Sequence, residues 1–159
     1  MALRIILFLT ISLSILFAQV GLDDVDALNK HKVALVNIEA KLEARYKAMR
    51  DTEKLSLLPV KTLIAQQQVH LLYLPELLII HIATGGQGAI FAAVLKQKVK
   101  AASVSLDGEL HLLNNALASA RKVEDVELLR ILQESLLALQ STYDDIIMRM
   151  PIYKGHFEE

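Results

Sequence analysis

The feature that most constrains the fold is the spacing of large apolar residues between Val123 and Met150. They recur at intervals of three or four positions: Leu128, Leu132, Leu136, Leu139, Tyr143, Ile146 and Met150. This spacing places them on one face of an α-helix. Leu129, Leu137 and Ile147 widen that face, which predicts a helix in contact with two neighbours. Pro151 is expected to end the helix and to leave residues 151–159 as a flexible tail.

The first half of the chain carries similar patterns. Residues Leu22 to Lys54 form one helical segment, with its apolar face made by Leu28, Leu35, Ile38, Leu42, Tyr46 and Met49. A second segment is expected to start near Pro59 and to run toward Tyr73. Pro75 has no amide hydrogen and disfavours helix at the residue before it, so a break or kink is expected there.

The composition supports helices throughout. Hydrophobic residues make up 53% of the 159 residues, but aromatic residues make up only 5%. An apolar mass of Leu, Ile, Val and Ala suits interlocking helices better than an aromatic-rich β-sandwich. Asp107 is expected to cap the start of a later helix. No linker or repeat divides the chain, so we predict an all-α fold: a compact antiparallel bundle of four to five helices over residues 19–150.

Charge and cysteine content exclude several functions. The formal net charge is −1, so no field of one sign exists to attract nucleic acid. The chain has no cysteine, which excludes disulfides, thiolate metal sites and cysteine nucleophiles. Neither observation identifies a partner.

The N-terminus predicts export. Arg4 precedes an apolar run from Ile5 to Phe17, and Ala18 is a small residue suited to precede a cleavage site. As a helix, the run covers about 20 Å, which is short of a hydrocarbon core of about 30 Å. We therefore expect residues 1–18 to be a signal peptide of a secreted or periplasmic protein. The alternative is an uncleaved membrane anchor.

A glycine-rich stretch near the centre, Gly85-Gly86-Gln87-Gly88, allows three interpretations. The first is close packing: Gly85, Gly86 and Gly88 admit a neighbouring helix or loop and form a hinge or turn. Because glycines weaken a helix by roughly 1 kcal/mol each, a helix is expected to stop at Thr84 and restart after Gly88.

The second interpretation is a dinucleotide site. Residues 77–83 and 104–106 would be strands, and a helix beginning after Gly88 would receive a pyrophosphate at Gly85, Gly86 and Gly88. Asp107 would then bind the ribose. Phe91 occupies the position where this motif needs a third glycine, and the flanking segments have helical periodicity. This enzyme is the lesser alternative.

The third interpretation is a membrane span over residues 77–95. No formal charge lies between Glu76 and Lys96, a length of roughly 28 Å as a helix. His81, Gln87 and the glycines oppose insertion. A small membrane protein, associated with the bilayer through this segment or through the N-terminal run, therefore remains an alternative.

No catalytic motif is found. The five histidines form neither an H-E-x-x-H motif nor a pair three or four residues apart, and no serine has a G-x-S-x-G setting. We therefore expect no metal, cofactor or catalytic residue. The sequence favours an exported, non-enzymatic helical protein that acts by protein–protein interaction, by self-association or by binding an apolar ligand.

Overall fold

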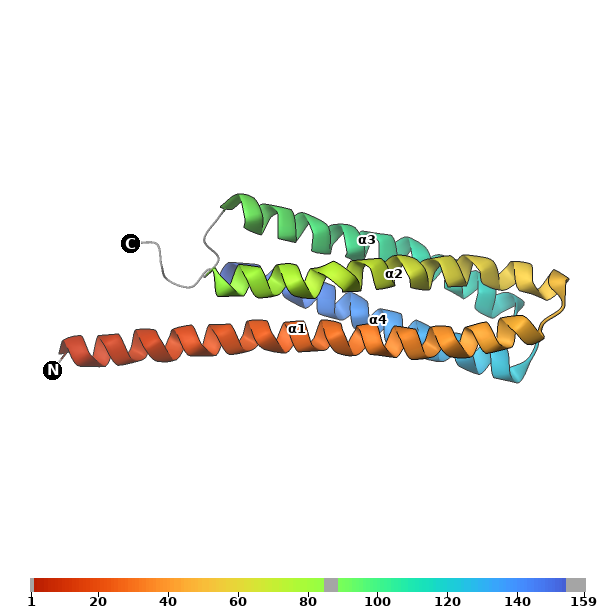
Figure 1. The fold of residues 1–159 in the computed structure, drawn as a ribbon, viewed down its shortest axis with the longest axis horizontal. Helices are drawn as coiled ribbons and strands as arrows, with labels where there is room; N and C mark the ends of the chain where they lie inside the picture. Colours follow the sequence, from red (N-terminus) through yellow and green to blue (C-terminus); the bar gives the residue numbers. More distant parts are fainter. Residues whose placement is uncertain (1, 85–88, 154–159) are drawn as a thin grey trace.

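A computed structural model of the protein describes residues 2–84 and 89–153, with side chains given for most of residues 19–151. These residues form four α-helices and no strand: α1 (Ala2–Ala48), α2 (Asp51–Ala83), α3 (Ala89–Ser119) and α4 (Val123–Tyr153). The helices pack against one another as an antiparallel bundle (Figure 1). The predicted all-α fold is confirmed, with four helices in the described part of the chain.

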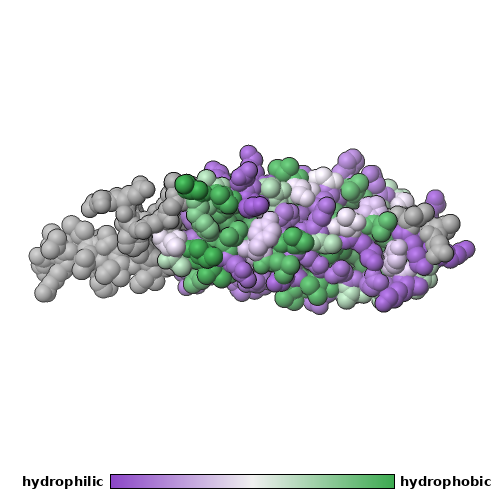
Figure 2. All heavy atoms as spheres, turned by 45° about the horizontal axis from the view of Figure 1, so that its top comes forward, coloured by the Kyte–Doolittle hydropathy of each residue, from purple (hydrophilic) through white to green (hydrophobic). Residues whose placement is uncertain are grey.

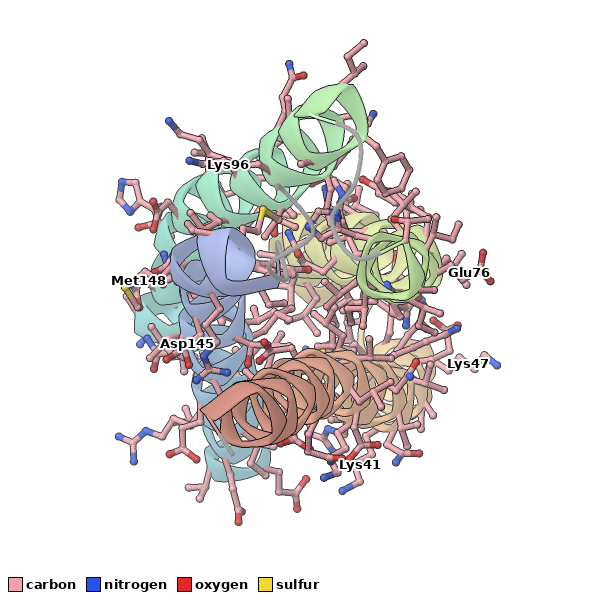
Figure 3. The ribbon with its side chains drawn as sticks, turned by 90° about the vertical axis from the view of Figure 1, so that its left-hand side faces the viewer. Lys41, Lys47, Glu76, Lys96, Asp145 and Met148 are labelled. Carbon is pink, nitrogen blue, oxygen red and sulfur yellow. The ribbon has the colours of Figure 1, made fainter. Side chains whose placement is uncertain are left out.

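The four helices lie at the corners of a square when the bundle is viewed along its length (Figure 3). Each helix contacts its two neighbours: α1 with α2 and α4, and α3 with α2 and α4. The pairing of α3 with α4 is antiparallel, as three hydrogen-bonded pairs show. Residue numbers rise on α3 while they fall on α4 in Ser103–Asp144, Asp107–Gln140 and Asn114–Gln133.

The core consists mainly of leucine. The main apolar face predicted on α4 is buried, with Leu132, Leu136, Leu139, Tyr143 and Ile146 inaccessible to solvent. Of the residues predicted to widen it, Leu129 is buried and Ile147 partly buried, but Leu137 is exposed, so that part of the prediction is wrong. On α1, Leu28, Leu35, Ile38 and Leu42 are buried as predicted, while Tyr46 and Met49 pack at its edge. A periodic apolar face thus becomes the inside of the bundle on both helices.

Two charged contacts join α1 to α4 near opposite ends of their interface. Arg149 lies 2.6 Å from the carboxylate of Asp24, and Arg45 lies 2.7 Å from that of Asp125. Both aspartates are buried. Because burying an unpaired carboxylate is costly, these arginines favour one register between the first and last helices.

The boundary between the first two helices differs from the prediction. Residues 22–54 are not one helix, because α1 ends at Ala48 and α2 begins at Asp51. Arg50 there has an extended backbone (φ −71°, ψ 154°). The predicted apolar face ends at Met49, so nothing in the pattern itself carries the helix to Lys54.

Of the break or kink predicted at Pro75, the break is wrong, and the kink stays a prediction. Helix α2 continues through both Pro59 and Pro75 to Ala83. A proline in a helix interior costs about 3 kcal/mol. Pro75 is buried, like the preceding core residue Leu74, whereas the following residue, Glu76, is exposed. Burial in the bundle therefore offsets a local cost that the sequence rule counts alone.

Two further helix boundaries need correction. Asp107 is not an N-cap, because it lies within α3, exposed, and accepts a hydrogen bond from Gln140 of α4. Pro151 does not end the last helix, which runs to Tyr153. Residues 154–159 of the predicted tail lie outside the described residues.

The start of α1 projects beyond the other three helices (Figure 1). It is one continuous helix from Ala2, and the first buried apolar residue described on it is Val25.

Candidate interaction surface

Helix α2 differs from a simple amphipathic helix because large apolar side chains lie on two opposite faces. We call the buried set the inner stripe; its members alternate by three and four positions and none is exposed. The inner stripe is Leu57, Val60, Ile64, Gln67, Leu71, Leu74, Leu78 and His81. A spacing that averages 3.5 residues keeps one line of side chains directed at neighbouring helices.

The inner stripe contains a buried polar cluster centred on Gln67. Its side-chain NH₂ donates to Glu109 of α3 at 2.8 Å, and its carbonyl accepts from the Tyr143 hydroxyl of α4 at 3.1 Å. Ser105 donates to the other oxygen of Glu109 at 2.7 Å. Three helices are therefore joined by one amide in the core.

Burial controls the ionisation of this cluster. It raises the pKa of Glu109 above its ordinary value, although the hydrogen bonds from Ser105 and Gln67 act in the opposite direction. Burial also raises the pKa of the Tyr143 hydroxyl. Both shifts favour neutral groups. Because each member already bonds another member, the cluster is suited to fixing helix pairing rather than to proton transfer.

The second apolar face of α2 points away from the bundle. We call it the outer stripe; its members also alternate by four and three positions, and every one is exposed. The outer stripe is Leu58, Thr62, Ala65, Val69, Leu72, Glu76, Ile79 and Ala83. Leu58, Val69 and Leu72 each expose more than half of their surface, at 51%, 55% and 57%. The same 3.5-residue repeat that packs the core thus recurs where no other described helix covers it.

The outer stripe carries one charge, Glu76, which points outward from α2 (Figure 3). The outer face of α4 is different, since Glu127, Arg130, Glu134 and Asp144 are all exposed there. Ordinary bundle helices keep such a charged outer face. Leu137 and Met148 are exposed on α4 as well, but charged residues lie between and beside them. The outer face of α2 differs because it carries a single charge along its length.

Apolar side chains also gather at one end of the bundle. Figure 2 shows them on the face over α2 and α3, densest near the end where α2 stops and α3 starts. Ile79 and Ile80 of α2 are 45% and 48% exposed, and Ile90 and Val94 of α3 are 83% and 42% exposed. The N-terminal part of α1 projects from this same end (Figure 1).

The glycines predicted to form a hinge or a cofactor site, Gly85, Gly86 and Gly88, lie outside the described residues. The surrounding helices end and begin as expected, at Ala83 and Ala89. The strands of the dinucleotide interpretation are wrong, because residues 77–83 and 104–106 are helical. Asp107, the predicted ribose ligand, lies within α3 rather than after a strand.

The membrane span predicted over residues 77–95 is divided between α2 and α3, so one straight helix over that range is not formed. A different segment, Leu57–Ala83 of α2, is the stretch of the described residues that is long and apolar enough to cross a membrane. Its inner stripe lies in the core. The apolar character that sequence analysis assigned to 77–95 therefore extends back along α2.

The histidines occupy separate positions. His31 lies 2.9 Å from the Thr142 hydroxyl, and His81 is buried and stacked on Phe91. His70 contacts the Tyr73 hydroxyl at 2.6 Å. Within residues 2–84 and 89–153, no group of three metal-ligating side chains is close enough to hold an ion.

Sequence analysis did not identify the outer stripe. The fold divides the consecutive glutamines of α2: Gln66 is exposed, Gln67 is buried and Gln68 is half-buried. Successive residues of a helix point about 100° apart, so three in a row cannot share one environment. A search for a second 3.5-residue repeat between Leu58 and Ala83 would have found the stripe.

Comparisons with protein-family models, with curated proteins and with solved structures give no match to this chain.

Proposed function

We propose that this protein is an exported, non-enzymatic helical bundle that acts by binding an α-helix along the outer stripe of α2. The observation that carries the proposal is the 3.5-residue repeat of exposed apolar residues from Leu58 to Ala83. Such a repeat is the arrangement by which one helix inserts its side chains between those of another.

A helix suits this surface better than a small apolar ligand does. Ligand sites are concave and enclose most of the ligand. The outer stripe instead runs along the convex outside of a helix, over roughly 38 Å from Leu58 to Ala83. Contact over that length requires an extended partner, and a second helix presents side chains with the same repeat.

Export is supported by the N-terminal segment. Residues Ile5 to Phe17 have the composition of a signal peptide. The start of α1, which cleavage after Ala18 would remove, projects past the other three helices (Figure 1). The same geometry fits an uncleaved anchor, because the start of α1 projects past the bundle (Figure 1).

A second candidate function is association with a bilayer through the end of the bundle. Ile79, Ile80, Ile90 and Val94 are exposed at the end from which residues 2–18 project. If that segment stays in the membrane, these side chains face the interface. Extraction of the full chain by alkaline carbonate would argue against this candidate, and retention in the pellet would support it.

The interaction is tested by photo-crosslinking in the producing cell. A photoreactive phenylalanine analogue replaces Val69 on the outer stripe or, as the control, Val104 on α3, which are 55% and 60% exposed. We expect covalent adducts from position 69 and few from position 104. Equal yields at the two positions, or no adduct at position 69, would contradict the proposed function.

A further inference from the structure

We propose that the helix bound by the outer stripe is α2 of a second copy of this chain, in antiparallel orientation about a two-fold axis. The inference rests on the proposed function and identifies its partner. When the two antiparallel stripes overlap over their full length, Leu58 of one copy lies beside Ala83 of the other, and Val69 of one copy faces Leu72 of the other. Thr62 then faces Ile79, and Ala65 faces Glu76.

Self-complementarity is the first argument. A two-fold interface uses the same patch on both copies, so large residues must meet small ones within one stripe. In this alignment Leu58 meets Ala83 and Glu76 meets Ala65, Ile79 meets the smaller Thr62, and Val69 and Leu72 meet at the centre. Each large residue outside the central pair therefore faces a smaller one.

Charge sets the direction. A parallel pairing would place Glu76 directly against Glu76 of the second copy, which is repulsive. Lys47 of α1 lies on the same side of the bundle as Glu76 (Figure 3). It is one helical turn beyond Glu43, which contacts Lys61 at 2.5 Å, so Lys47 lies beside the start of α2. Antiparallel pairing separates the two Glu76 carboxylates and places Glu76 of the second copy nearer to this basic end than parallel pairing does.

The contact area is compatible with a dimer when exposed apolar residues of α1 add to the outer stripe. A stripe of about 38 Å by roughly 10 Å gives about 400 Å² per copy, about half of the roughly 800 Å² per partner in a standard interface. Glu39 of α1 accepts a hydrogen bond from Gln68 at 2.8 Å, and this register places Val36 beside Leu72. Val36 and Val33 are exposed and extend the apolar surface on that side.

The orientation is tested with cysteines, because the natural chain has none. Thr62→Cys and Ile79→Cys are prepared separately in the full chain, with tags of different size, and oxidised alone and as a mixture. We expect a disulfide-linked heterodimer from the mixture and little homodimer from either variant alone. In the antiparallel pair, position 62 of each copy lies roughly 25 Å from position 62 of the other, too far for a disulfide.

The role of the outer stripe in self-association is tested with Leu72→Glu and, as the control, Val104→Glu on α3. By analytical ultracentrifugation we expect Leu72→Glu to weaken the dimer at least tenfold and the control to leave it unchanged. At a dilution where all forms are monomers, melting temperatures equal to that of the wild type show that the fold of both variants is intact.

The remaining outcomes separate the two proposals. Disulfides from Thr62→Cys alone would overturn the antiparallel orientation. A monomer at every concentration, with no disulfide from the mixture, would overturn the second copy as partner. An adduct at position 69 with a mass other than that of a dimer would then leave the proposed function supported.

Discussion

The two apolar faces of α2 have the same repeat and opposite environments. Along the inner stripe, Leu71 is fully buried, whereas its neighbour Leu72 on the outer stripe is 57% exposed. Hydrophobicity alone therefore does not determine which face enters the core. The inner stripe is distinguished by Gln67, whose hydrogen bonds need Glu109 and Tyr143 at fixed positions. The polar members of the outer stripe, Thr62 and Glu76, are exposed, so no buried hydrogen-bond cluster ties this face to another described helix.

The largest expected effect compares these two leucines directly. Leu71→Ala should lower the free energy of unfolding by about 2–5 kcal/mol, because it leaves a cavity in the core. Leu72→Ala should change it by less than about 0.5 kcal/mol in the monomer. Urea denaturation of dilute protein measures both. Equal losses would show that the outer stripe is also covered within one chain.

A smaller effect is expected from the polar centre of the inner stripe. Gln67→Leu removes the hydrogen-bond partner of Tyr143 and one of the two partners of Glu109, and should cost about 1–3 kcal/mol of unfolding free energy. Gln66→Leu, at the exposed neighbouring position, is the control and should be close to neutral. If both variants retain wild-type stability, the cluster does not fix the helix pairing.

The third prediction concerns pH. Burial raises the folded-state pKa of Glu109 above its ordinary value near 4.5. Its contribution to stability is therefore fully present below that value and is lost as pH rises through the raised pKa. The unfolding free energy of wild type minus that of Glu109→Gln should fall over this range and then become constant. A difference that rises with pH would contradict this account.

The smallest effect on the monomer is expected at Glu76. Glu76→Leu makes the outer stripe free of charge and should change monomer stability by less than about 0.5 kcal/mol. It should tighten self-association by about tenfold, because a large apolar side chain replaces the carboxylate in the contact. It should also remove the preference for antiparallel over parallel pairing of the two α2 helices. A chain with both Thr62→Cys and Glu76→Leu should then form homodimeric disulfides. Cross-linking that stays confined to the mixture would show that Glu76 does not set the orientation.

Much of the fold could be predicted because periodicity reports burial directly. The inward residues of α4 and α1 follow from their spacing, and Thr84 and Ala89 mark the expected interruption between α2 and α3. Pro75 and Asp107 were assigned wrongly for a common reason. Both are residues with strong local preferences, and packing against the neighbouring helices determines their conformation instead.

The interaction surface was harder to predict from the sequence. A helix that is apolar on one side reads as amphipathic, but one that is apolar on two sides reads as a buried helix or a membrane span. Residues 77–95 were accordingly interpreted either as closely packed helices or as a membrane span. Only the positions of α1 and α3 beside α2 show which of its apolar faces is covered. The buried Gln67–Glu109–Tyr143 cluster likewise needs three helices to be placed before its members meet.

The order of the helices around the bundle also bears on how the chain folds. Contacts between α1 and α2, α2 and α3, and α3 and α4 join consecutive helices, so they need only local loop closure. The contact of Asp24 with Arg149 joins positions 125 residues apart. We expect hairpins to nucleate quickly and the first and last helices to meet late, so that mutation of Arg149 accelerates unfolding while hardly slowing refolding.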